Sequence, residues 1–480
     1  MTVNSSTTIH DLSVEIISFI FLIATHHFED PFESVLLPIT VSHVCSRWRD
    51  VAIWTRGLWT SIVFTFPICR SQLSRSMTWL SRSHPFPIDI FLDFRDPSWA
   101  WEEDVHRFQL KHMAPILETL LAHVKRWRHF ELLTDTWAPI YFFLWNIRTV
   151  EAAPLLRSLS LSRCNAYFAS KRAIFEPVQL QDPIPLFGGL ALDALRDVSL
   201  VGVHVDWDRS SLRNLSSLEF KYHASGVMPS LDQFLDILSE CLELRRLSII
   251  GWGPQFENLE AEENTGTQEI RDPETEARRI IQLRHLIQFS FGFVDVNYAI
   301  KVLSLFEFPS IQDLTLEDVS FTLNPVEYQD ATPILGWLTP SADSSTSITR
   351  TACGIPLHSI LTLELHNIHV DKRVSSHFFS ALRNLQVLGL FNVADSTLRA
   401  LHPSADPCTP HPCPNLMELE CVDVDPTTLA DLVQSRAMID SILPLKSILF
   451  DSNYPLQQLT HDDCVELNDV GVNLSRITDY

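Results

Sequence analysis

The sequence has few of the residues and motifs that mark several large classes of protein. Its nine cysteines include no Cys-x-x-Cys pair, which disfavours a secreted disulfide framework and predicts reduced thiols in a cytosolic or nuclear protein. The thirteen glycines form no Gly-x-Gly-x-x-Gly and no phosphate-loop signature, and neither Gly-x-Ser-x-Gly nor His-Glu-x-x-His occurs. No uncharged run reaches the ~18 residues of a membrane span. Nothing in the sequence therefore predicts a catalytic site, a cofactor or a membrane segment.

Basic residues are also scarce, with 36 Lys and Arg against 59 Asp and Glu, for a net charge of -23. Such a surface repels phosphate backbones unless a local basic face overrides the net field. No such face is evident from the sequence, so we expect no nucleic-acid partner.

Apolar residues are abundant at 46% of 480 residues, including 29 Phe and 12 Trp. A chain of this length exceeds the ~250 to 300 residues at which a single hydrophobic core stops growing. The sequence therefore predicts either several domains or a repeat array, with enough apolar side chains to fold.

Two amphipathic helices are predicted near the N-terminus. Leu12, Ile16, Phe19, Ile20 and Ile23 have the three-and-four spacing of one helical face. A second helix begins near Pro38 and runs past Ala52, with its apolar positions at Val41, Val44, Cys45 and Trp48. Because so short a segment has little interior, part of this apolar surface is expected to await a partner. On periodicity alone, a helical cap over the end of the next domain explains the pattern equally well.

Specific residues favour the partner. Leu12-Ser13-Val14-Glu15-Ile16-Ile17, Val44-Cys45-Ser46-Arg47-Trp48-Arg49 and Gly57-Leu58-Trp59 together resemble the F-box of fungal, basidiomycete-type F-box-like proteins. Trp79-Leu80-Ser81-Arg82-Ser83 with Pro87-Ile88-Asp89-Ile90 is similar to the segment that follows the F-box in those proteins. The chain departs from the family at Ser13, where a proline is usual, and in the long insertion between the two halves.

The resemblance implies that the N-terminal helices dock on a Skp-type adaptor linked to a cullin, while the rest of the chain holds a protein substrate for ubiquitin transfer. The protein would carry out no bond chemistry itself. The residues expected to contact the adaptor are Leu12, Ile16, Ile20, Val44, Cys45, Trp48, Leu58 and Trp59. Trp48 is equally compatible with a position in the core of the module.

A Leu-x-x-Leu-x-Leu pattern recurs beyond residue 120 and predicts eleven strands. The middle apolar positions of these candidate strands are Phe130, Leu159, Val198, Leu218, Leu247, Phe289, Leu314, Leu363, Leu388, Leu419 and Ile448. Between strands, Ser230 with Gln233 and Asp425 with Pro426 are signals for the start of a helix. The interval from Leu215 to Leu244 is 29 residues, the length of a long leucine-rich repeat. Acidic 257–275 and Ser- and Thr-rich 341–351 interrupt the pattern and are expected to be insertions.

The predicted fold is therefore α/β, with an F-box-like helical domain at 1–62, a linker and cap at 63–123, and an irregular leucine-rich-repeat solenoid at 124–480. Its parallel sheet would expose the residue that lies between the two closest apolar positions of each strand. That row is Glu131, Ser160, Ser199, Glu219, Ser248, Ser290, Thr315, Glu364, Gly389, Glu420 and Leu449.

Acidic residues dominate this row and the positions two residues before and after it, where the only basic side chains are Lys221 and Arg246. Such a field attracts Lys- and Arg-rich segments and repels phosphorylated ones. We therefore expect a basic, unphosphorylated substrate segment, with Glu219, Glu364 and Glu420 as contacts. A solvated face that only keeps the protein soluble is the alternative.

The remaining candidates for chemistry are weak. His402, Cys408, His411 and Cys413 lie close together, but their spacing matches no structural zinc site, so no metal is expected. Two other functions stay open at this point. One is a repeat scaffold that no longer binds the adaptor, and the other is an enzyme whose catalytic groups converge only in space.

Overall fold

The protein folds into two compact units, which a computed structural model describes over residues 9–27, 31–101, 105–171, 173–256, 280–324, 328–339, 354–403, 410–451 and 473–476. The first unit comprises Met1–Asn165 and Glu176–Ser211, and the second comprises Ala166–Phe175 and Leu212–Tyr480. The two expected insertions and Cys408 lie outside the described residues. None of the described helices is long and apolar enough to cross a membrane.

The first unit begins with a helical module, defined here as residues 9–59. Its helices are α1 (Val14–His26), α2 (Pro31–Ser34), α3 (Leu37–Ser42) and α4 (Ser46–Trp54), flanked by the 3-10 turns η1 (Ile9–Asp11) and η2 (Arg56–Trp59). The sequence predicted one helix from Pro38 past Ala52. Two form instead, because Cys45 is extended, with φ -159° and ψ 170°, and begins α4 as its N-cap.

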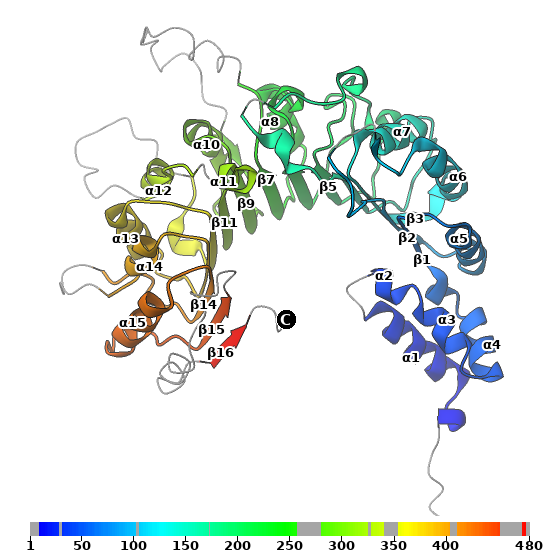
Figure 1. Ribbon diagram of the computed structural model, residues 1–480, viewed down its shortest axis with the longest axis horizontal. Coiled ribbons are helices and arrows are strands. Elements are labelled where there is room, and N and C mark those ends of the chain that lie inside the picture. Colours follow the sequence, from blue (N-terminus) through cyan, green and yellow to red (C-terminus); the bar gives the residue numbers. More distant parts are fainter. Residues whose placement is uncertain are drawn as a thin grey trace, which may run out of the picture. The chain divides into compact units, whose positions relative to one another are not determined.

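Five parallel strands follow in the first unit, in spatial order β1-β2-β3-β4-β5. They are β1 (Ser61–Thr65), β2 (Ile88–Asp93), β3 (Trp127–Thr134), β4 (Ser158–Arg163) and β5 (Asp197–Val201). Helices α5 (Arg70–Arg82), α6 (Leu110–Leu121) and α7 (Trp137–Ile147) connect the first four of these strands, and Figure 1 shows them on one side of the strands. Residues 63–123, expected as a linker and cap, are therefore two strand-helix units of the sheet.

The second unit continues the same alternation in a parallel sheet, in spatial order β6-β7-β9-β11-β12-β13-β14-β15-β16. Its strands are β6 (Ser217–Lys221), β7 (Arg246–Ile250), β9 (Gln288–Phe293), β11 (Asp313–Asp318), β12 (Thr362–His366), β13 (Val387–Phe391), β14 (Glu418–Val422), β15 (Ser447–Asp451) and β16 (Asn473–Arg476). The short strands β8 (Ile281–Gln282) and β10 (Phe306–Glu307) form a separate pair.

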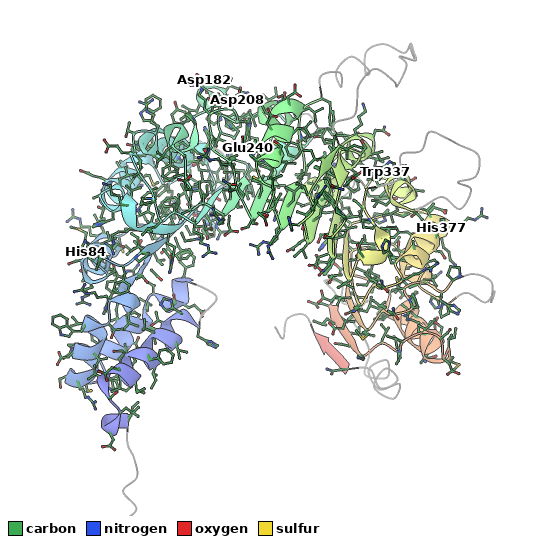
Figure 2. The ribbon with its side chains drawn as sticks, turned by 180° about the vertical axis from the view of Figure 1, so that it is seen from behind. His84, Asp182, Asp208, Glu240, Trp337 and His377 are labelled. Carbon is green, nitrogen blue, oxygen red and sulfur yellow. The ribbon has the colours of Figure 1, made fainter. Side chains whose placement is uncertain are left out.

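The helices of the second unit connect these strands. They are α8 (Leu231–Ser239), α10 (Val296–Leu303), α11 (Val319–Leu323), α12 (Thr332–Leu338), α13 (Lys372–Ala381), α14 (Asp395–Arg399) and α15 (Pro426–Ala437). Figure 1 shows α10, α12, α13 and α15 on the same side of the sheet. In Figure 2, His377 of α13 lies on the side of its helix that faces away from the strands.

The helix starts obey the local signals in the sequence. Ser230 Oγ accepts the Gln233 N–H at 3.3 Å, and Gln233 Oε1 accepts the Ser230 N–H at 2.9 Å, which closes the capping box of α8. Asp425 Oδ2 accepts the Thr428 N–H at 3.0 Å at the start of α15. Both predicted helix starts are confirmed.

All eleven predicted strands are present, so the α/β repeat fold with a parallel sheet and covering helices is confirmed. The predicted row also lies in register within each unit: Glu131 pairs with Ser160 and Ser160 with Ser199. In the second unit the register runs through Glu219, Ser248, Ser290, Thr315, Glu364, Gly389, Glu420 and Leu449. The apolar residues on either side of this row, such as Leu363 and Leu365, are fully buried against the helices.

Several strands end on a residue in the left-handed backbone region. Asn367, Asn392 and Asp423 follow β12, β13 and β14 with φ between 52° and 58°, and Gly251 follows β7 with φ 103°. Asn, Asp and Gly tolerate this region best. The N–H of each of these four residues then donates to the neighbouring strand, as from Asn367 to Phe391 O at 2.9 Å. The repeat therefore has a common way of turning the chain out of the sheet.

Candidate protein-interaction surfaces

Helix α1 is apolar on more than one side, and the module covers only one of them. Ser13 caps the helix, its Oγ accepting the Ile16 N–H at 3.5 Å. Ile17 and Phe21 are buried against the rest of the module, and Phe21 meets the ring of Trp48 edge-on at 4.9 Å. The apolar side chains on the other sides of α1 have no such cover.

These uncovered side chains form what we call the α1 apolar face. Its members are more than two fifths exposed: Ile16 (48%), Phe19 (60%), Ile20 (41%) and Ile23 (53%). Soluble proteins rarely leave so many large apolar side chains together in water unless a partner covers them. The α1 apolar face therefore has the properties of a protein-binding surface.

A groove extends this face toward α3. It has a volume of about 500 Å³ and is lined by Ile20, Ile23, Ala24, His27 and Leu37. Leu36, beside it, is half exposed. An apolar groove next to an apolar helix face suits an amphipathic helix of a partner.

The structure places six of the eight predicted adaptor contacts at or near the surface. Ile16 and Ile20 lie on the α1 apolar face, and Val44 is 59% exposed in the turn between α3 and α4. Leu12, Cys45 and Trp48 are half-buried. Arg47 Nη2 donates a hydrogen bond to Leu12 O at 2.5 Å, and the Trp48 N–H donates to Cys45 Sγ at 3.4 Å.

Leu58 and Trp59 are corrections to the prediction, because both are core residues. Trp59 is fully buried, its Nε1 donates to Ala52 O at 2.8 Å, and its ring meets that of Trp79 edge-on at 4.6 Å. Leu58 is 2% exposed. The turn η2 contacts α1 and α4 of the helical module on one side and α5 on the other. Its two side chains therefore join the module to the sheet and offer a partner no surface.

Periodicity did not identify the other members of the α1 apolar face as contacts. Phe19 and Ile23 were assigned only to the helix. The predicted stripe is the outward face, while Ile17 and Phe21 lie inward. These residues are identified by counting the exposed apolar side chains of each helix in the structure, which the spacing in the sequence does not give.

The helix-free side of the sheet in the second unit is a separate candidate surface. Glu364 and Glu420 lie two strands apart, with Gly389 of β13 between them, a separation of about 10 Å at the usual ~4.8 Å strand spacing. Burial, and then the charges of Glu364 and Glu418, raise the pKa of Glu420. The His366 hydrogen bond, with Nε2 at 3.3 Å from Glu364 Oε2, lowers the pKa of Glu364.

Glu219 does not join this pair. It lies four strands from Glu364 in the register, and its carboxylate is 2.6 Å from Lys221 Nζ. The structure therefore brings together two of the three predicted substrate contacts. Glu131 and Asp197, also in the predicted acidic field, belong to the first unit.

An aromatic pair beside the two glutamates was not predicted. The ring of His366 stacks on Phe391 with centroids 4.2 Å apart and planes 4° apart. A Cβ at Gly389 would approach the Phe391 ring to 2.5 Å, so the ring position requires glycine there. Thr315 Oγ1 also donates to Glu364 at 3.2 Å. Together these residues present a flat ring next to the carboxylate of Glu364, which His366 and Thr315 hold in place.

A pocket of about 300 Å³ lies at the end of strands β9 and β11 in the same unit. Lys171 Nζ at its rim is 2.8 Å from Asp295 Oδ2, so the ammonium is already paired. The residues that line it are Tyr167, Ser170, Lys171, Val294, Ser320, Leu323, Asn324 and Gln329.

The described metal candidates, His402, His411 and Cys413, do not form a metal site. Among the described residues, no group of three or more His, Cys, Asp and Glu is placed to hold a metal ion. His402 Nδ1 lies 3.2 Å from Ser435 Oγ, and Cys413 Sγ donates to Phe379 O at 3.4 Å.

Comparison with known proteins finds no matching family model and no matching curated protein. Among solved structures, the chain is similar to one described as "Crystal structure of Rad7 and Elc1 complex in yeast". The identity is 14% over 96% of this chain and 92% of that chain, with a TM-score of 0.32. That likeness is too weak to transfer a function, which has to be inferred from the chain's own residues.

Proposed function

We propose that this protein is the substrate-recognition subunit of an SCF-type ubiquitin ligase, and that its helical module docks on a Skp-type adaptor. The α1 apolar face carries the proposal. Ile16 of the F-box-like motif and Ile20, one turn further along α1, lie on that face, and Val44 of the motif is exposed in the same module. Burying such side chains at an interface contributes about 25 cal/mol per Å² of apolar surface.

The sheet of the second unit is the proposed substrate arm. Its helix-free side presents half-buried carboxylates at Glu364 and Glu420, a geometry that suits a basic, extended segment of a protein substrate. In this role the chain positions a substrate and an adaptor and performs no bond chemistry itself.

Reconstitution tests the adaptor contact directly. The purified full chain and a purified Skp-type adaptor should form a 1:1 complex by size-exclusion chromatography with light scattering. Affinity purification from cells should recover a cullin, and should recover more substrate when the proteasome is inhibited. A chain that stays separate from the adaptor at micromolar concentration would favour a repeat scaffold without ligase function.

Charge reversal tests the substrate arm once a partner is in hand. Glu219→Lys, Glu364→Lys and Glu420→Lys together should weaken binding by at least about tenfold, because each variant replaces an attraction with a repulsion. Binding by the unmodified chain should also weaken as salt rises from 50 to 500 mM, since added ions screen partly exposed charges. Titration calorimetry measures both effects.

The matched control carries the same change in charge on the helix side of the unit: Asp236→Lys, Glu240→Lys and Asp431→Lys, all at exposed positions. It should leave substrate affinity within about twofold of the unmodified chain. Binding that is insensitive to salt, or a partner that binds only when phosphorylated, would refute the basic-segment hypothesis.

A further inference from the structure

Arginine is concentrated in one stretch of this acidic chain. Between Glu33 and Asp89 there are six arginines and one acidic residue, Asp50, which gives that stretch a net charge of +5. The whole chain carries -23. The sequence was expected to contain no basic face, and the fold overturns that expectation by bringing part of this stretch around one pocket.

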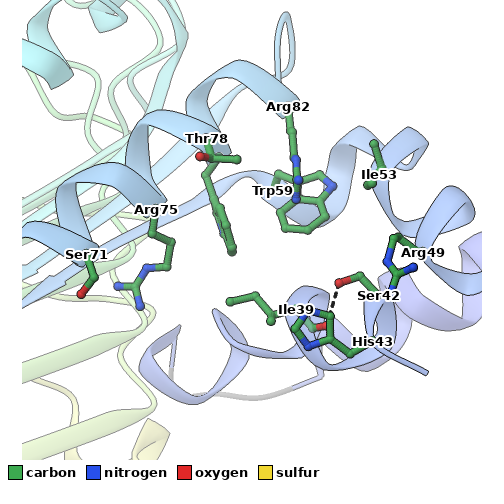
Figure 3. A pocket seen from close by; sticks show the side chains of 11 residues that line it. Ile39, Ser42, His43, Arg49, Ile53, Trp59, Ser71, Arg75, Thr78 and Arg82 are labelled. Atoms are coloured by element: carbon green, nitrogen blue, oxygen red, sulfur yellow. Dashed lines mark hydrogen bonds between the residues drawn. The ribbon is translucent and has the colours of Figure 1, made fainter. Parts of the chain in front are cut away.

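The pocket lies in the first unit between the helical module and α5 and has a volume of about 460 Å³. Figure 3 shows Arg75 and Arg82 projecting from α5 toward α3, which carries Ile39 and Ser42. Its lining residues are Ile39, Ser42, His43, Arg49, Ile53, Trp59, Ser71, Arg75, Thr78, Trp79 and Arg82. Among these described side chains, none is acidic.

The guanidinium groups of Arg75 and Arg82 are held in place while keeping free donors, and that of Arg49 belongs to an exposed residue. Arg82 lies over the ring of Trp59, 4.3 Å from its centroid, a contact that uses the face of the cation and none of its N–H groups. Arg75 Nη2 donates to Val63 O at 3.0 Å, which occupies one of its five N–H donors. Arg49 and Arg82 make no ion pair with any described residue.

Such an arrangement is costly without a counter-ion. Burial lowers the pKa of Arg75, because a guanidinium loses hydration there, yet an arginine stays charged at neutral pH. Three like charges around one space also repel each other. None of the described acidic residues lines this pocket, whereas cations that are partly buried, as Arg75 and Arg82 are, are usually paired with carboxylates.

We propose that this pocket binds a small soluble molecule carrying two or more phosphate groups. Arginine presents a planar fork that bonds two phosphate oxygens at once, and three arginines match a multiply charged anion. The volume suits a small ligand, since such pockets measure about 300 to 1,000 Å³. Ser71 and Thr78 on α5 add hydroxyl groups for polar substituents.

The ligand would also have a structural effect. Arg49 and His43 belong to the helical module, whereas Arg75 and Arg82 belong to the first strand-helix unit of the sheet. A phosphate ligand contacting both parts would join them and would stabilise the folded first unit by mass action.

Tripolyphosphate is the probe that tests the proposal on the full chain. At 1 mM it should raise the midpoint of thermal unfolding by several degrees and give a saturable calorimetric isotherm. The double variant Arg49→Gln/Arg82→Gln should bind at least about a hundredfold more weakly, since each lost charge-assisted contact accounts for about tenfold. Both arginines lack ion-pair partners among the described residues, so the variant should still fold.

Arg70→Gln is the control, because it removes one positive charge from the exposed start of α5 without touching the pocket. It should keep its affinity within about threefold. Sulfate at equal ionic strength and citrate at equal charge should give no comparable shift. Equal binding by Arg49→Gln/Arg82→Gln, an equal response to citrate or sulfate, or binding only to vesicles containing phosphoinositides would each overturn the proposal.

Discussion

Replacing Ile16 and Ile20 together by alanine is expected to abolish binding of a Skp-type adaptor. Both side chains lie on the α1 apolar face, where they are 48% and 41% exposed in the free chain. Buried anchors at protein interfaces contribute about 2 kcal/mol each when truncated, so the pair should weaken the complex several hundredfold. Surface plasmon resonance with immobilised adaptor measures the loss.

The same variant should fold normally. Alanine is a better helix former than isoleucine, and neither side chain belongs to the core. The matched control is Leu242→Ala/Met438→Ala, which removes two exposed apolar side chains from the second unit. If that control loses adaptor binding as well, or if Ile16→Ala/Ile20→Ala keeps it, the α1 apolar face is not the docking surface.

Trp59→Ala should destabilise the first unit by about 3 to 5 kcal/mol, the usual cost of truncating a buried tryptophan. The side chain fills the space between the helical module and α5, packs against Trp79, and holds Arg82 over its ring. Trp59→Phe keeps an aromatic ring but loses the hydrogen bond from Nε1 to Ala52 O. It should lower the stability of the first unit by about 1 kcal/mol for that bond, with a smaller loss from the reduced packing.

Trp54→Ala is the control, because Trp54 lies five residues earlier and is 77% exposed. It should change stability by less than about 0.5 kcal/mol. Urea denaturation gives the overall effect, and amide hydrogen exchange in α4 and β1 assigns it to the first unit. A stable Trp59→Ala chain that no longer binds the adaptor would return Trp59 to the contact surface.

Much of the repeat arm could be predicted because its signals are local. A residue such as Glu364 is flanked by Leu363 and Leu365, and the alternation in a strand sends both leucines to the buried face and Glu364 to the opposite one. Parallel repeats then pair in the order of the chain, so the predicted row from Glu219 to Leu449 lies in register. The first two strands were missed because β1 buries three consecutive residues, Ile62 to Phe64, and β2 lacks the leucine spacing.

The candidate surfaces depended more on packing between distant segments. The spacing of Ile16 and Ile20 fits a helix face but does not tell which face is covered, because Ile17 and Phe21 on the other side are equally apolar. In the same way, Gly389 and Phe391 in β13 give no sign in sequence that His366 will stack there beside Glu364. Hydrophobic periodicity predicts that a face exists, and neighbouring elements decide whether it is buried.

The sequence by itself determined eleven of the strands, the caps of α8 and α15 and the polar row of the sheet, since each depends on residues within about one repeat of one another. Only the tertiary structure decided that Trp59 is core, that the α1 apolar face points outward, and that Arg49 shares a pocket with Arg82. Those outcomes depend on which surfaces of α1, α4 and α5 cover one another. Burial is a property of the assembled elements, whereas strand and helix preferences are properties of the local chain.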